Sequence, residues 1–121
     1  MKYILLIFVC LTSCVTAAQS ASPIIPKQGI AVIEYGADWC WACKKVAPIL
    51  EQASKDMGFY LAHIDADKTS EKSYISYHKV FAIAYMPLIS IFYNGRIFYH
   101  GGWSGKSDFV EMINMLQEKS K

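Results

Sequence analysis

Two cysteines, Cys40 and Cys43, separate two segments of different hydrophobic periodicity. The segment Ile30 to Tyr35 is apolar and rich in β-branched residues, and Gly36 ends it, which is typical of a buried strand. After the cysteines, apolar residues recur at helical spacing; they are Val46, Ile49, Leu50 and Ala53. The pattern predicts a strand, a tight loop and a helix, with Cys40 at or near the start of the helix.

This position indicates what the two sulfurs can do. Only a thiolate attacks a disulfide, and a free cysteine is mostly protonated at neutral pH. The unpaired N–H groups and partial positive charge of a helix N-terminus favour the anion, so we expect Cys40 to be the nucleophile. Cys43 follows one helical turn later on the same face, from which it can attack a mixed disulfide formed by Cys40.

Composition limits the alternatives. A chain of 121 residues, 54% hydrophobic and 18% charged, can hold one compact domain and hardly two. The formal net charge is only +2 and the lysines are scattered, so nothing indicates a nucleic acid or an acidic surface as partner. Of the four cysteines, Cys10 and Cys14 lie in the first segment, which leaves one close pair. A bridge across so small a loop restricts the unfolded chain little, so the pair suits redox switching better than structural cross-linking.

The first segment has the three-part layout of a secretory signal. Met1-Lys2 carries a positive charge, Tyr3 to Leu11 is continuously apolar, and Thr12 to Ala21 is small and polar. The apolar run is shorter than the roughly 20 residues that a membrane-spanning helix needs. We therefore predict a signal peptide over residues 1–20, a linker over 21–28 and one domain over 29–121. A buried N-terminal core helix is the weaker alternative, because no polar face interrupts the run.

The signal segment is compatible with two mature forms of the protein, one secreted and one anchored by a lipid. Val15-Thr16-Ala17 and Ala18-Gln19-Ser20 both offer small residues for a signal peptidase, which predicts a soluble periplasmic protein. Leu11 to Cys14 instead resembles a bacterial lipobox, in which Cys14 is lipidated and anchors the protein to a membrane, facing the periplasm. Export is expected in both cases, and membrane contact only in the second.

The remaining elements complete an α/β pattern. Asn94-Gly95 is a strong hairpin signal between two strands, and Ser107 can cap a last helix. The expected elements are the strands Phe59 to Ile64, Leu88 to Tyr93 and Arg96 to His100, and the helix Ser70 to His78. The apolar stripe of the last helix consists of Phe109, Met112, Ile113 and Leu116. The long interval from Asp65 to Pro87 predicts an extended helix or an extra loop.

Several motifs together resemble the thioredoxin superfamily from about Gly29 to the end of the chain. They are Trp39-Cys40-Trp41-Ala42-Cys43-Lys44, Pro48, Met86-Pro87 and Phe92-Tyr93-Asn94-Gly95. The pieces Ala37 to Cys40 and Ala42 to Lys44 are most similar to the C-terminal thioredoxin-like domain of the transmembrane reductase DsbD and related periplasmic proteins. The resemblance implies a thioredoxin-like α/β fold with a central mixed sheet flanked by helices. It also implies a thiol:disulfide oxidoreductase with no cofactor beyond the Cys40–Cys43 disulfide.

The resemblance also implies substrate-binding residues. Pro87 matches the cis-proline that lies opposite the disulfide and binds the extended backbone of the substrate; otherwise it merely starts a strand. Met86 would contact substrate, or else fill a gap in the core. Trp39 is expected to pack beside the disulfide and shield it, and Trp41 to form an exposed rim for partners.

Glu34 interrupts the apolar strand, and it precedes Cys40 by the interval at which family members hold a buried acid. Burying an unpaired carboxylate is costly, so such a group favours its protonated form. It could take the proton of Cys43 when that thiol attacks. The alternative is an edge-strand residue whose carboxylate reaches water.

Other functions fit the sequence less well. A c-type haem would need a histidine after Cys43, where Lys44 stands, and a zinc site would need two more ligands, whereas the histidines His63, His78 and His100 are far apart. The serious rival is a non-enzymatic thioredoxin-fold binding module, or a metal carrier that uses the same cysteines. No histidine lies between the cysteines, which favours a reductase or electron relay acting on protein thiols and disulfides. We expect a membrane partner such as a DsbD-like reductase to keep it reduced.

Overall fold

The structure is a computed structural model that describes residues 25–68 and 85–121. Its elements are β1 (Ile30–Gly36), α1 (Trp41–Met57), β2 (Tyr60–Asp65), β3 (Leu88–Tyr93), β4 (Arg96–Gly102) and α3 (Lys106–Lys119). The strands form one sheet in the order β2-β1-β3-β4, with β1 and β2 parallel and the other neighbours antiparallel. This mixed sheet flanked by helices confirms the predicted fold class. The predicted signal segment, Cys14 and the helix Ser70 to His78 lie outside the described residues.

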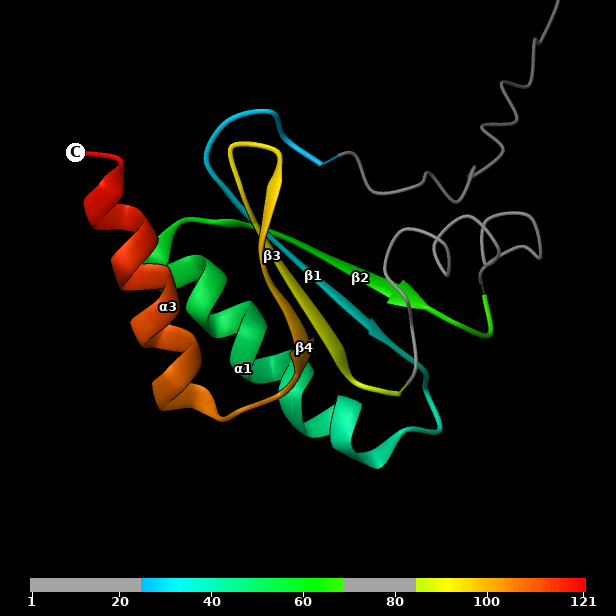
Figure 1. Cartoon of the computed structure of the whole chain (residues 1–121). Coiled ribbons are helices and arrows are strands. Elements are labelled where there is room, and N and C mark those ends of the chain that lie inside the picture. The colour runs from blue at the N-terminus through cyan, green and yellow to red at the C-terminus, as the bar shows by residue number, and fades with distance from the viewer. Residues whose placement is uncertain (1–24, 69–84) are drawn as a thin grey trace, which may run out of the picture.

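Helices α1 and α3 cover one face of the sheet (Figure 1). Between them and the sheet lies a core to which the strands and both helices contribute: Val32, Val46, Leu50, Ala53, Phe59, Ile89, Ile91, Phe109, Ile113 and Leu116. A second cluster lies on the opposite face and contains Ala31, Ile33, Tyr35, Ile64, Leu88 and Phe92. Strand β1 therefore buries side chains on both faces, as its continuous apolar run predicts.

Helix α1 begins directly after Cys40 and ends at Met57, with Gly58 as its C-cap. Gly58 has a φ of 74°, a left-handed conformation that glycine adopts without steric cost, and its N–H donates to the carbonyl oxygen of Ser54. The buried face of the helix contains Val46, Leu50 and Ala53 of the predicted stripe, whereas Ile49 is only partly buried. The register of this stripe fixes how the first turn of α1, with the cysteines, sits on the sheet.

The predicted hairpin is confirmed, but β4 runs to Gly102, two residues beyond the predicted His100. Asn94 and Gly95 have φ values of 49° and 78°, as a two-residue turn with two positive φ angles requires. The predicted cap of the last helix is wrong. Helix α3 already includes Lys106, its N-cap is Gly105, and no side chain caps it.

The positive φ of Gly105, 115°, lets the chain enter α3 earlier than the Ser107 pattern predicted. The carbonyl oxygen of Gly105 accepts the N–H of Phe109 at 3.1 Å. The apolar stripe of α3 is confirmed, since Phe109, Ile113 and Leu116 are buried and Met112 packs against the same core.

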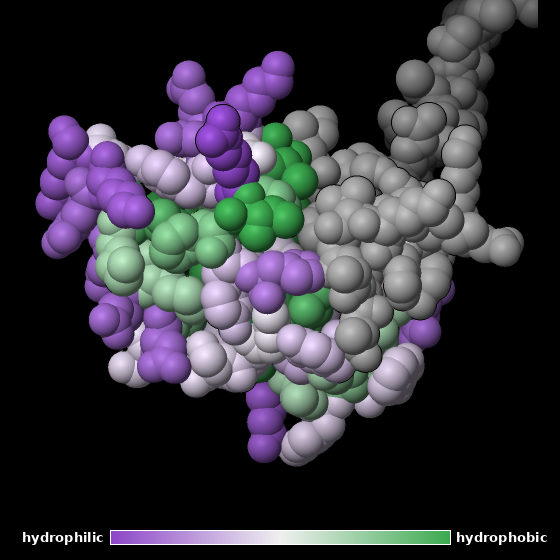
Figure 2. Space-filling view, in the orientation of Figure 1, coloured by the Kyte–Doolittle hydropathy of each residue, from purple (hydrophilic) through white to green (hydrophobic). Residues whose placement is uncertain are grey.

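The outer surface follows the amphipathic pattern of the elements. Figure 2 shows hydrophilic residues gathered at the C-terminal end of α3 and at the tip of the β3–β4 hairpin, with smaller apolar areas between them. Within residues 25–68 and 85–121, neither helix combines the length and the hydropathy needed to cross a membrane.

Candidate active site

Cys40 and Cys43 are joined by a disulfide at the first turn of α1. Cys40 is the N-cap residue, and its Sγ accepts the backbone N–H of Cys43 at 3.2 Å. Its own N–H donates to the carbonyl oxygen of Ala37 at 3.0 Å. The first turn carries no acidic residue, so no side chain of that turn offsets the partial positive charge at this end of α1. This geometry favours negative charge on Cys40 Sγ when the disulfide is reduced.

Small and apolar side chains enclose the disulfide. Ala37 is buried with the two cysteines, and Ala66 and Met86 pack against them. The peptide bond between Met86 and Pro87 is cis, as the resemblance implies. Pro87 is buried and immediately precedes β3, so the loop from Met86 to β3 lies next to the sulfurs.

The two tryptophans around the cysteines are largely solvent-exposed. Trp41 is 71% exposed, and Lys45 Nζ lies 5.2 Å from the centre of its ring, consistent with the predicted rim. Trp39 is 69% exposed and stands in the loop before the helix. Ala66 and Met86 pack against the two cysteines, and shielding of the disulfide by Trp39 stays a prediction. Tyr85, which the sequence did not single out, adds another exposed aromatic ring beside Met86.

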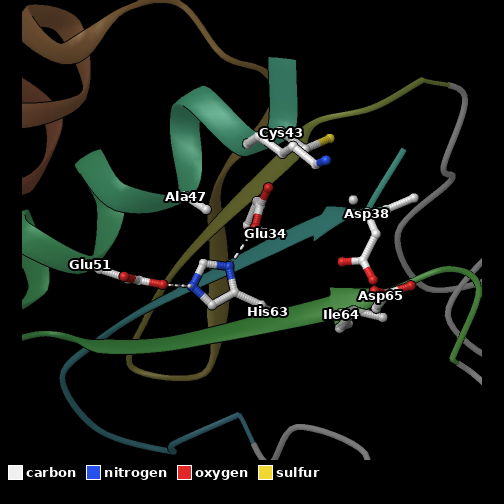
Figure 3. Close-up of a pocket in the computed structure, with 11 residues that line it drawn as sticks. Glu34, Asp38, Cys43, Ala47, Glu51, His63, Ile64 and Asp65 are labelled. Carbon is white, nitrogen blue, oxygen red and sulfur yellow. Dashed lines mark hydrogen bonds and ion pairs between the residues drawn. The ribbon is translucent and has the colours of Figure 1, made fainter. Parts of the chain in front are cut away.

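Glu34 lies on the α1 side of β1, close to Cys43. Because β1 is an inner strand and Glu34 is buried, the edge-strand alternative is excluded. A Cβ atom placed on Gly36 would lie 2.9 Å from Cys43 Sγ and 3.1 Å from Glu34 Oε1. Gly36 thus leaves open the space that the acid and the sulfur both border. Figure 3 shows the carboxylate between Cys43 on one side and His63 on the other.

His63 is a site residue that the sequence did not assign to the cysteines. It is the register partner of Glu34 on the parallel strand β2, and its Nδ1 forms a hydrogen bond with Glu34 Oε2. Its Nε2 lies 3.6 Å from Glu51 Oε1 on α1. The hydrogen bond with Glu34 raises the pKa of His63; burial opposes this, and the charges of Glu34 and Glu51 reinforce it. Glu34 is therefore a paired buried acid, not the unpaired one expected from the strand pattern.

These groups line a pocket of about 190 Å³ that opens beside α1 (Figure 3). Its lining includes Glu34, Cys43, Ala47, Glu51 and His63. At its rim, Lys68 Nζ lies 3.1 Å from Asp38 Oδ2 and 3.5 Å from Asp65 Oδ2. In the described part of the chain, no three His, Cys, Asp or Glu side chains are grouped so that they could hold a metal ion.

Comparisons with known proteins agree with this geometry. The thioredoxin family model matches residues 12–118. Protein disulfide-isomerase A4 of Mus musculus is 31% identical over 104 residues, which are 81% of this chain and 16% of that protein. Thioredoxin of Bacillus subtilis (strain 168) is 24% identical over 90 residues, 72% of this chain and 82% of that protein. The protein disulfide-isomerases are thus much longer than the matched segment.

Solved structures show the same fold. Thioredoxin of Fasciola hepatica superposes with a TM-score of 0.62 at 20% identity, over 74% of this chain and 83% of that one. Together with the Cys40–Cys43 pair, the family match supports thiol–disulfide oxidoreductase activity in general. The family normally needs no cofactor. By the family match, the mixed sheet and the disulfide at the start of α1, this chain belongs to the thioredoxin family.

Proposed function

We propose that the protein is an exported thiol:disulfide oxidoreductase that works as a reductase or electron relay for extracytoplasmic proteins. The observation that carries the proposal is the position of Cys40 Sγ at the N-cap of α1, where it accepts a backbone N–H. A sulfur held there is favoured as a thiolate, the form that attacks disulfides.

The first half of the reaction captures the substrate. In the reduced protein the Cys40 thiolate attacks one sulfur of a substrate disulfide. A bond forms between Cys40 Sγ and that sulfur, and the other substrate sulfur leaves as a thiolate that takes a proton from water. The exposed Trp39 and Trp41 and the Met86-Pro87 loop border the sulfurs and supply the surface on which an extended protein segment can lie.

The second half releases the substrate. Cys43 loses its proton to the Glu34 carboxylate and attacks Cys40 Sγ. The bond between Cys40 and the substrate breaks, the second substrate sulfur leaves as a thiolate and is protonated by water, and the protein keeps the Cys40–Cys43 disulfide. The substrate has gained two electrons, which a dithiol donor must restore to the protein.

The direction of electron flow is proposed from the residues between the cysteines. A strong oxidant is expected to have a donor such as histidine between its cysteines, which over-stabilises the thiolate. Here Trp41 and Ala42 occupy these two positions, and neither supplies such a donor. We propose a membrane dithiol reductase of the DsbD type as the donor. The resemblance of the Ala37 to Cys40 and Ala42 to Lys44 pieces to that protein's own thioredoxin-like domain supports this proposal. Export is proposed from the signal layout of residues 1–20 and, for an anchored form, from Cys14.

The central experiment combines turnover with trapping. We expect the protein to accelerate reduction of insulin by dithiothreitol, and Cys40→Ala to abolish this. Cys43→Ala should accumulate a mixed disulfide with partners in an extract of the exported fraction, and Cys40→Ala, its matched control, should not. A protein without turnover, whose cysteine variants capture nothing, would instead be a binding module.

Two further measurements test the proposed direction of electron flow and the proposed export. A reduction potential near the about −270 mV of thioredoxin supports a reductase, whereas one near the about −120 mV of a strong oxidant contradicts it. Mass spectrometry of the mature N-terminus tests export. An acylated Cys14 identifies the anchored form, a free terminus beyond Cys14 identifies the secreted form, and an intact Met1 contradicts the proposal.

A further inference from the structure

The pocket beside α1 reaches the second cysteine from a side that the proposed reaction with protein substrates does not use. We propose that this pocket is a second entrance to the disulfide, through which a small thiol carrying an ammonium group attacks Cys43 Sγ and reduces the protein. This route rests on the proposed function in one respect, because it requires a redox-active Cys40–Cys43 disulfide. It adds a donor of low molecular weight to the membrane donor proposed above.

The first support is the position of the pocket relative to the two sulfurs. Among the described residues, Cys43 lines the pocket and Cys40 does not. Gly36 also lines it, and the Cβ position that this glycine leaves empty is 2.9 Å from Cys43 Sγ. Displacement at a sulfur needs an approach from the side away from the leaving sulfur. A pocket of about 190 Å³ that borders Cys43 but not Cys40 offers this approach to a thiol of a few heavy atoms.

The second support is the difference between the two possible leaving sulfurs. Exchange is faster when the leaving sulfur is the more stable thiolate. Attack on Cys43 expels Cys40, whose Sγ is at the N-cap of α1 and accepts the N–H of Cys43 at 3.2 Å. Attack on Cys40 expels Cys43, whose Sγ borders the same space as the Glu34 carboxylate, and a neighbouring negative charge disfavours a thiolate. Exchange at Cys43 is therefore favoured electronically, and access decides whether it occurs.

The third support is the charge of the pocket, which distinguishes one small thiol from another. The lining carries four carboxylates, those of Glu34, Asp38, Glu51 and Asp65 (Figure 3). The described cations that face them are Lys44, Lys68 and, when it is protonated, His63. Glu51 is 58% exposed and lies 3.6 Å from His63 Nε2, so its carboxylate can still accept an ammonium group. A cationic thiol is therefore attracted to the pocket and an anionic one is repelled.

Two molecules of the thiol are consumed for each protein disulfide that is reduced. The thiolate of the first attacks Cys43 Sγ; a bond forms between these sulfurs, the Cys40–Cys43 bond breaks, and Cys40 leaves as a thiolate. The second attacks the sulfur of the first, and the two leave as a small disulfide. Cys43 departs from that bond as a thiolate and takes a proton from water. The two small thiols have lost two electrons, and the protein holds them as its dithiol.

The test labels each cysteine of the site separately with thionitrobenzoate, in full-length protein in which Cys10 and Cys14 are replaced by serine. Cys40→Ala carries the label on Cys43, and Cys43→Ala carries it on Cys40. Because thionitrobenzoate is the better leaving group, its release reports attack on the labelled cysteine itself. The attacking thiols are cysteamine, which is cationic, 2-mercaptoethanol, which is neutral, and 3-mercaptopropionate, which is anionic. Each rate is divided by the rate with the same labelled protein unfolded in urea, which removes the intrinsic reactivity of the thiol.

The expected result is an order of rates that depends on the cysteine. At Cys43, cysteamine should be about two- to fivefold faster than 2-mercaptoethanol, the range of an exposed ion pair, and 3-mercaptopropionate should be the slowest. Glu51→Gln should reduce the advantage of cysteamine. At Cys40, which the pocket does not border, cysteamine should have no advantage.

Filling the pocket tests access directly. Ala47 lines it from α1, and Ala47→Leu places a larger side chain there. This change should slow release from Cys43 by cysteamine at least about tenfold, since exchange depends on access, and should leave release from Cys40 unchanged. Gln52→Leu is the matched control, because it adds the same side chain at an exposed position of α1 outside this pocket; it should alter neither rate.

The outcomes distinguish this entrance from the function on which it rests. Failure of the insulin and trapping experiments contradicts the proposed oxidoreductase itself. If those experiments succeed but Ala47→Leu releases the label from Cys43 as fast as its parent, the entrance is overturned and the oxidoreductase stands. If Ala47→Leu does not fold, the three thiols decide the matter: the same order at both cysteines, or an order at Cys43 that favours the anionic thiol, refutes the entrance.

Discussion

Substitution of Gly36 by alanine tests the close approach of Cys43 to Glu34. The added Cβ would lie 2.9 Å from Cys43 Sγ, 3.1 Å from Cys43 Cβ and 3.1 Å from Glu34 Oε1. Non-bonded heavy atoms normally approach to roughly 3.5–4.0 Å, so three atoms of the two neighbouring residues, Cys43 and Glu34, must move at once. The backbone of Gly36 is outside the left-handed region, and the change therefore tests space and not dihedral strain.

The expected cost follows from overpacking a buried site. One extra methyl group in a closely packed interior costs about 1–3 kcal/mol. For a domain of this size we expect Tm to fall by at least about 4 °C. The oxidised form should lose more stability than the reduced form, because the disulfide holds Cys43 Sγ in place, whereas a free thiol can rotate away from the methyl group.

The assay is urea unfolding of Gly36→Ala in both redox forms, followed by circular dichroism. Gly58→Ala serves as the control. It places an alanine at a φ of 74° with no neighbour within 4 Å, and it should cost stability equally in both forms. If Gly36→Ala unfolds at the same urea concentration as the wild type in both forms, the inferred proximity of sulfur and carboxylate is refuted.

Three further outcomes are expected. Leu50→Ala should lower the free energy of unfolding by about 2–5 kcal/mol in urea titrations, because Leu50 is fully buried between α1 and the sheet; a loss below that range would contradict its place in the core. Gly95→Ala should destabilise the hairpin by about 1 kcal/mol, owing to its φ of 78°, and hydrogen exchange of β3 and β4 should rise locally, whereas unchanged exchange would exclude the turn. His63→Gln should be less stable than wild type below pH 6.5, the ordinary pKa, and this difference should shrink as pH rises through the raised pKa of the folded state; a difference that grows with pH has the wrong sign.

Local patterns predicted most elements near the site. The strand over Ile30 to Tyr35 and the helix ending before Gly58 follow from periodicity and a helix-ending glycine, and both determine where Cys40 lies. The hairpin at Asn94 and Gly95 follows from the preference of those residues for positive φ. These features depend on interactions over a few residues, which the order of amino acids displays directly.

The partner of Glu34 could not be predicted in the same way. His63 meets Glu34 only through the register of two parallel strands separated by α1, and register depends on packing of the whole layer. A usable signal was present, since the predicted strand from Phe59 to Ile64 carries one histidine among apolar and aromatic residues, and the strand before it carries one glutamate in a similar setting. Comparing the two strands as neighbours would have suggested the pair.

One local expectation failed. Ser107 matched the preferred N-cap types, but Gly105, with a φ of 115°, turned the backbone into α3 earlier. The side-chain preference of a single residue therefore did not decide where the helix begins.

The pairing of Gly29 with Asn94 determines how the redox end is presented. Gly29 N–H donates to Asn94 Oδ1 at 2.9 Å, and Asn94 N–H donates to the Gly29 carbonyl oxygen at 3.0 Å. These two hydrogen bonds hold the residue that precedes β1 against the tip of the β3–β4 hairpin. β1, which has 7 residues, then runs about 20 Å to the cysteine loop. An anchor attached upstream of Gly29 would therefore act at the end of β1 opposite the disulfide, and the first turn of α1 would face away from the point of attachment.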